Sequence, residues 1–140
     1  MKTLLKLALL VLAGLLIWAY ATWPRINDVE TGKTPEYPDL RPKMYAASVA
    51  KVAKASEEAI GHLPRWTLVG SGSGPLGHSI QAISTTRVLR FKDDVTVRIY
   101  REGPWTYVTV RSKSRIGKGD FGQNARNIRD FLAELDRLMS

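Results

Sequence analysis

The stretch that decides the fold runs from residue 95 to residue 112, Val-Thr-Val-Arg-Ile-Tyr-Arg-Glu-Gly-Pro-Trp-Thr-Tyr-Val-Thr-Val-Arg-Ser. Apolar and polar side chains alternate through both halves, which is typical of strands with one buried and one solvated face. Glu102-Gly103-Pro104 separates the halves and predicts a tight turn, so we expect an antiparallel hairpin. Its buried face would carry Val95, Val97, Ile99, Val108 and Val110, and its open face Thr96, Arg98, Tyr100, Tyr107, Thr109 and Arg111.

Amphipathic helices and further strands flank this hairpin. Residues 44–62 and the segment from Asp120 onward repeat apolar side chains at helical spacing, and Asp120 with Gln123 forms a capping pattern at a helix N-terminus. Residues 66–69 and 80–86 are expected to form two more strands. The prediction is an α+β fold, a two-layer domain with an antiparallel sheet of three to four strands packed by two helices, in the order α-β-β-β-β-α.

A glycine-rich segment lies between two of the expected strands. Residues 72–77, Gly-Ser-Gly-Pro-Leu-Gly, match the pattern Gly-x-Gly-x-x-Gly of dinucleotide-binding turns. That site needs a helix directly after the glycines, whereas residues 78–86 alternate like a strand. We therefore interpret residues 70–77 as a flexible hairpin loop and predict no cofactor.

The N-terminal segment is predicted to meet a membrane. Residues 7–23 carry no charge, and an apolar run of about this length just spans a bilayer. Lys2 and Lys6 on the short flank favour a cytoplasmic N-terminus with the following domain outside. The alternative is a signal sequence cleaved at Ala21. The expected organisation is a transmembrane anchor or signal sequence over 1–23, a Pro-rich linker over 24–42 and an extracytoplasmic domain over 43–140.

Charge and composition limit the classes of partner that the protein is expected to bind. The formal net charge is +8, from 21 basic and 13 acidic residues, and favours anionic partners. A location outside the cytoplasm argues against nucleic acid. The absence of cysteine excludes disulfides, thiolate metal sites and thiol catalysis. The two histidines, His62 and His78, have no metal-binding spacing, so we predict no metal site.

The junction between the last strand and the last helix, residues 111–128, concentrates Arg, Ser, Asp and Asn beside glycines. One interpretation is an anion-binding face; the other is a hydrogen-bonded corner in which Arg111 or Arg115 pairs with Asp93 and Asp94. In the second case, loss of Asp94 or Arg111 is expected to destabilise the fold sharply. The candidate anion-binding residues are Arg98, Arg101, Arg111, Ser112, Ser114 and Arg115. The candidate structural residues are Asp93, Asp94, Gly117, Asp120, Gly122 and Asn124.

Three short motifs carry a family resemblance. They are Phe91-Lys-Asp-Asp-Val95, Arg111-Ser-Lys-Ser-Arg-Ile-Gly117, and Asp120-Phe-Gly-Gln-Asn124 followed by Ile128. Over residues 35–138 the chain resembles the bacterial and plastid family called domain of unknown function 1499. It departs from the family at Asn127, where many members carry arginine. The resemblance implies no activity. It supports an extracytoplasmic domain, often tethered or lumenal. We expect this chain at the bacterial inner membrane with its C-terminal domain on the periplasmic side, or secreted or periplasmic if the segment is cleaved at Ala21.

Two functions remain open at this point. The favoured one is a membrane-tethered binding or assembly module whose basic sheet face meets an anionic lipid head group, an envelope polymer or an acidic protein. The alternative is an enzyme on a small anionic substrate, with Asp93 or Asp94 as acid or base and Arg111 and Arg115 as clamps. The absence of a suitably placed histidine or cysteine favours the binding module.

Overall fold

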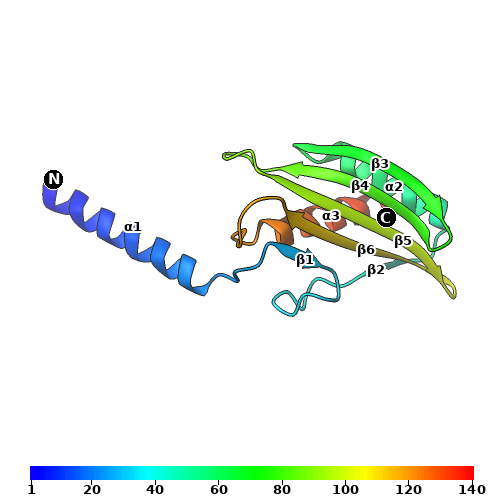
Figure 1. Ribbon diagram of the computed structural model, residues 1–140, viewed down its shortest axis with the longest axis horizontal. Helices are drawn as coiled ribbons and strands as arrows, with labels where there is room; N and C mark the ends of the chain where they lie inside the picture. The colour runs from blue at the N-terminus through cyan, green and yellow to red at the C-terminus, as the bar shows by residue number, and fades with distance from the viewer.

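The computed structural model describes residues 1–140, in which one N-terminal helix projects from a domain formed by the rest of the chain (Figure 1). Helix α1, Lys2–Thr22, extends away from the domain and buries none of its side chains. By length and composition it could cross a membrane. The helix is thus compatible with the expected anchor or signal sequence.

The domain is built on one antiparallel sheet covered on one face by two helices (Figure 1). Its strands lie in the order β1-β6-β5-β4-β3, and β2 also pairs with β6. The predicted α+β class is confirmed, but the sheet has six strands rather than three to four. The strands are β1 (Asp28–Glu30), β2 (Lys43–Tyr45), β3 (Trp66–Gly74), β4 (Gly77–Thr85), β5 (Lys92–Glu102) and β6 (Trp105–Ser114), and the covering helices are α2 (Val49–His62) and α3 (Gln123–Met139).

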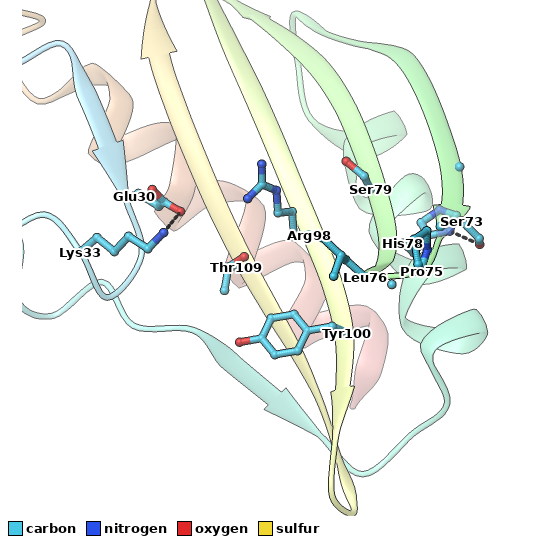
Figure 2. Close-up of a pocket in the computed structure, with 13 residues that line it drawn as sticks. Glu30, Lys33, Ser73, Pro75, Leu76, His78, Ser79, Arg98, Tyr100 and Thr109 are labelled. Atoms are coloured by element: carbon cyan, nitrogen blue, oxygen red, sulfur yellow. Dashed lines mark hydrogen bonds and ion pairs between the residues drawn. The ribbon is translucent and has the colours of Figure 1, made fainter.

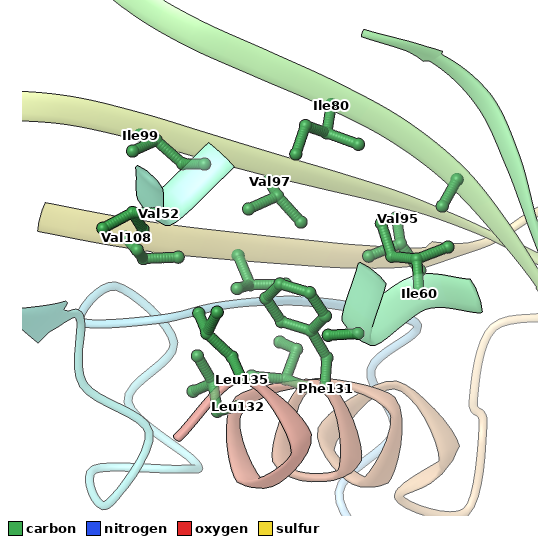
Figure 3. Close-up of a cluster of buried hydrophobic side chains, with 14 of the residues drawn as sticks. Val52, Ile60, Ile80, Val95, Val97, Ile99, Val108, Phe131, Leu132 and Leu135 are labelled. Carbon is green, nitrogen blue, oxygen red and sulfur yellow. The ribbon is translucent and has the colours of Figure 1, made fainter. Parts of the chain in front are cut away.

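The central hairpin forms as its alternation predicts. β5 pairs with β6 so that Val97 lies opposite Val110 and Ile99 opposite Val108. All four side chains are buried against the helices, where Phe131 of α3 fills the middle of the core (Figure 3). Burial of this continuous apolar layer is the main force that holds the helices on the sheet. The opposite face of the sheet carries no helix (Figure 1).

The Pro-rich segment 24–42 was expected to be a linker, and that expectation is wrong for much of it. Its residues Asp28–Glu30 form β1 on the edge of β6, and Val29 is fully buried. Thr31 continues the attachment, because its backbone N–H donates to the carbonyl of Val110 and its hydroxyl accepts from the Val110 N–H. The edge of β6 would otherwise present unpaired backbone groups, and this segment supplies partners for them.

Two further expectations are corrected at strand ends. The helix expected from Met44 begins at Val49, because residues 43–45 pair with β6 as β2, and the Ser48 hydroxyl caps the helix by accepting from the Lys51 N–H. The glycine-rich loop expected over 70–77 is instead the end of the β3–β4 hairpin, whose strands pair up to Gly74 and Gly77. Gly77 has a φ of 113° and lies too close to the backbone of Ile99 to admit a side chain.

Candidate anion-binding groove

The first group of polar motif residues lies on the helix-covered face, at the start of α3. Asn124 is fully buried, and both the oxygen and the nitrogen of its side-chain amide form hydrogen bonds. Its Oδ1 accepts from Ser112 Oγ at 2.6 Å, and its Nδ2 donates to Ser114 Oγ at 2.7 Å and to Asp120 Oδ2 at 2.6 Å. Ser112 and Ser114 therefore tie β6 to α3. They do not contribute to the anion-binding face that was predicted for them.

Asp120 binds the backbone at the start of this helix. Its two carboxylate oxygens accept from the backbone N–H groups of Gly122 and Asn124 at 2.8 and 2.9 Å. Asp120 was predicted to be the N-cap, but the N-cap is Gly122, because α3 begins at Gln123 rather than at Asp120 or Phe121. The Asp120 carboxylate still binds a backbone N–H of the first turn. Gly122 allows this geometry, because it adopts a left-handed φ of 76° that side chains disfavour. The Gln123 side chain donates to Asn127 and does not complete the expected capping box.

The adjacent carboxylates Asp93 and Asp94 point to opposite faces of β5. Asp93 is buried under α3, where Asn127 Nδ2 donates to its Oδ2 at 2.8 Å. Burial raises the pKa of Asp93 above its ordinary value. Asp94 lies on the open face and binds the Arg115 guanidinium through two hydrogen bonds of 3.0 and 2.7 Å. Those bonds lower the pKa of Asp94.

The predicted pairing of the two Asp residues with arginine is thus correct only for Asp94 and Arg115. Arg111 instead binds Asp28 of β1, with contacts of 2.9 and 2.6 Å, and holds the edge strand in place. Its hydrogen bond lowers the pKa of the Asp28 carboxyl. Both ion pairs are exposed rather than buried. The buried acid of this region, Asp93, is satisfied by an amide instead.

The open face of the sheet contains a groove of about 690 Å³ (Figure 2). It extends from the segment after β1, across β6 and β5, to the turn of the β3–β4 hairpin. A row of three opposed residues crosses its floor, Ser79 on β4, Arg98 on β5 and Thr109 on β6. A smaller hollow continues the groove toward Thr96 and Arg111. The residues that line the groove are mainly polar, charged or glycine, and they include the Glu30 carboxylate, which is paired with Lys33.

Arg98 differs from the other cations of this groove. Lys33 is held by Glu30 at 3.0 Å and Arg111 by Asp28, whereas no carboxylate lies within ion-pair distance of Arg98. Arg98 is exposed and lines both the groove and the smaller hollow. A guanidinium offers paired donors that match a carboxylate or a phosphate. This position can therefore accept one anionic group without breaking an existing ion pair.

The structure brings together only some of the predicted anion-binding residues. Arg98 and Arg111 line the hollows of the open face. Arg101 lies outside, near the β5–β6 turn, where its Nε donates to the Gly103 carbonyl. Arg115 is at the other end of the sheet with Asp94. Strand alternation could have identified Thr109, but Lys33 could not be placed, because nothing in the Pro-rich segment indicates that it folds onto this sheet.

The residues that could supply metal ligands are dispersed, and no group of three or more His, Asp or Glu side chains is arranged to hold a metal ion. The buried amides and carboxylate under α3 bond to one another. The polar motif therefore stabilises the junction of β5, β6 and α3, and the groove on the other face is the candidate binding site.

These features define a small α+β domain behind an N-terminal apolar helix. Residues 20–135 match the family model described as "Protein of unknown function (DUF1499)", and the chain belongs to that family. No curated protein matches the chain. Among solved structures it is similar to CalU16 from Micromonospora echinospora, with 14% sequence identity over 71% of this chain and 73% of that one, and a TM-score of 0.41.

Proposed function

We propose that this chain is a membrane-tethered extracytoplasmic binding module whose open sheet face holds an anionic partner. The observation that carries the proposal is Arg98, an exposed guanidinium on the floor of a polar groove with no carboxylate partner of its own. The hydroxyls of Ser79 and Thr109 flank it on the neighbouring strands. The three together suit a phosphate or carboxylate group.

The shape of the groove favours an extended partner. It is open to solvent along the sheet and has few apolar side chains, unlike the enclosed apolar pockets that bind small molecules. It reaches the turn between β3 and β4, at the end of the sheet far from α1 (Figure 1). An anionic envelope polymer or an acidic protein segment can reach that position more readily than a lipid head group of the bilayer that α1 enters.

The N-terminal helix supports the tethered location. An apolar helix of this length with Lys2 and Lys6 at its start is suited to a retained anchor with the domain outside the cytoplasm. The alternative enzyme has less support, because its four residues do not converge. Asp93 faces the helices, while Asp94 and Arg115 bind each other and Arg111 binds Asp28.

The proposal is tested by comparing Arg98→Gln with Arg101→Gln in the full chain in detergent. Both variants remove one positive charge from β5, but only Arg98 lines the groove. We expect Arg98→Gln to weaken binding of fluorescent polyglutamate and of polyphosphate about tenfold, the usual effect of losing one charged hydrogen-bonding group. Arg101→Gln should bind like the wild type. Equal losses in the two variants would show that only net charge matters and would refute the groove.

A further inference from the structure

The end of the sheet nearest α1 carries two neighbouring loops. One is residues 86–91 between β4 and β5, and the other is residues 115–122 between β6 and α3. Figure 1 shows both loops on the side of the domain from which α1 extends. Backbone hydrogen bonds hold them to the same strand ends, because Thr86 N–H donates to the Phe91 carbonyl and Arg115 N–H to the Lys92 carbonyl. The two loops thus form one end surface.

Large apolar side chains project from these loops into solvent. Val88 is 83% exposed, Leu89 67% and Ile116 62%, and Phe91 and Phe121 are also exposed. None of them belongs to the hydrophobic core or packs against it. Several apolar side chains at one end of a domain mark an interaction surface rather than a requirement of folding.

Cations accompany these apolar side chains. Arg87, Arg90 and Lys92 lie on or beside the first loop and Lys118 on the second, and none has a carboxylate within ion-pair distance. The acids at this end are already engaged, Asp94 by Arg115 and Asp120 by the start of α3. The surface is therefore positively charged as well as apolar, a combination that suits the interface of an anionic bilayer.

The end of α1 is attached to the same surface. The Phe121 ring lies 6.4 Å from the ring of Tyr20 and 6.5 Å from that of Trp23. Trp23 also packs on Gly122, where an added Cβ would come within 2.8 Å of the indole nitrogen. Tyr and Trp side chains at the end of a spanning helix favour the interfacial level of a membrane. This contact places the second loop at that level.

We propose that loops 86–91 and 115–122 dock the domain on the acidic phospholipid surface of the bilayer that α1 enters. The apolar side chains enter the interface, and the unpaired cations meet lipid phosphates. The inference rests on the retained anchor of the proposed function but not on the groove, which reaches the opposite end of the sheet. Docking would fix the orientation of the groove relative to the membrane.

The chain contains no cysteine, so single labelling sites can be introduced freely. We would place a nitrobenzoxadiazole fluorophore at Leu89→Cys and, as the matched control, at Leu76→Cys, which is an equally apolar exposed residue in the turn between β3 and β4. The labelled full chain is inserted into vesicles of phosphatidylcholine alone or of equal parts phosphatidylcholine and phosphatidylglycerol. Flotation selects inserted protein, and lipids with a nitroxide near the head group report contact by quenching.

In the mixed vesicles we expect a blue-shifted fluorophore at position 89 that is quenched several-fold more than the one at position 76. Quenching at 89 should fall in phosphatidylcholine alone and in an Arg87→Gln/Arg90→Gln background whose circular dichroism matches the wild type. Equal quenching at the two positions would overturn the docking surface. Quenching at 89 that is independent of phosphatidylglycerol and of both arginines would overturn its anionic specificity. Failure to float would instead reject the anchor, while polyanion binding by Arg98 would be unaffected.

Discussion

The residues of the polar motif have different roles on the two faces of the sheet. On the covered face, Ser112, Asn124 and Asp93 are buried and bonded to one another or to neighbouring side chains of α3. On the open face, Arg111 and Asp94 stand in exposed ion pairs. Buried polar groups need hydrogen-bond partners and therefore fix the positions of the elements that carry them. Exposed ion pairs contribute little to stability and can exchange their partners. The covered face is therefore structural, and the open face is where binding is expected.

The largest effect in this comparison is expected from Asn124→Ala. The change removes an amide whose oxygen and nitrogen bond to Ser112, Ser114 and Asp120, and it takes away the acceptor of the buried Ser112 hydroxyl. We expect a loss of about 3 kcal/mol in the free energy of unfolding, measured by urea denaturation. Gln123→Ala, on the adjacent and less buried position, is the control. A loss for Asn124→Ala no larger than that of the control would show that the network is not structural.

An intermediate effect is expected from Asp93→Asn, and it depends on pH. Because burial raises the pKa of Asp93, the folded protein binds more protons at this site than the unfolded chain does once the pH exceeds the ordinary value of 3.8. Stability therefore falls as the pH rises through the window between that value and the raised pKa. The side chain of Asp93→Asn does not ionise, so this fall in stability is absent from the variant.

Asp93→Asn should thus gain stability over the wild type at neutral pH and lose that advantage near pH 3.8. Urea unfolding of the wild type and the variant, from neutral pH to below pH 3.8, measures the difference. Asp94→Asn is the matched control, and its effect on stability at neutral pH is expected to have the opposite sign. The pKa of Asp94 is lowered by Arg115, so that carboxylate contributes stability at neutral pH that is lost as the pH falls below 3.8. Parallel curves for the two variants would contradict the assignment of the two faces.

The smallest effect is expected from Asp94→Ala. The sequence alone led us to expect a sharp loss of stability here, on the assumption of a buried pair. The Arg115–Asp94 pair is instead exposed, and exposed pairs contribute little and are screened by salt. The change in the urea midpoint should be a small fraction of that of Asn124→Ala and should shrink further at high salt. A loss as large as that of Asn124→Ala would restore the original expectation.

The sequence predicted the structure correctly wherever the spacing of apolar side chains along one segment matched the face that is buried. Alternation in residues 95–112 predicted the hairpin and assigned each side chain to its face, and apolar spacing predicted most of both helices. The failures occurred where the partner is distant in sequence. Asp28 and Lys33 lie in a Pro-rich stretch without a period, yet the strand there pairs with residues 111–113, about eighty positions away.

By itself, then, the sequence determined the α+β class, the apolar N-terminal helix and the two faces of the central hairpin, because these follow from side-chain order along one segment. Only the tertiary structure decided which charges pair. Arg111 binds Asp28 because β1 joins the edge of β6, and Asp93 is buried because α3 crosses above it. Arg98 remains without an ion-pair partner because the acidic side chain that lines the groove, Glu30, pairs with Lys33 instead. Such pairings depend on distances between segments, and these are set only when the sheet and its helices pack together.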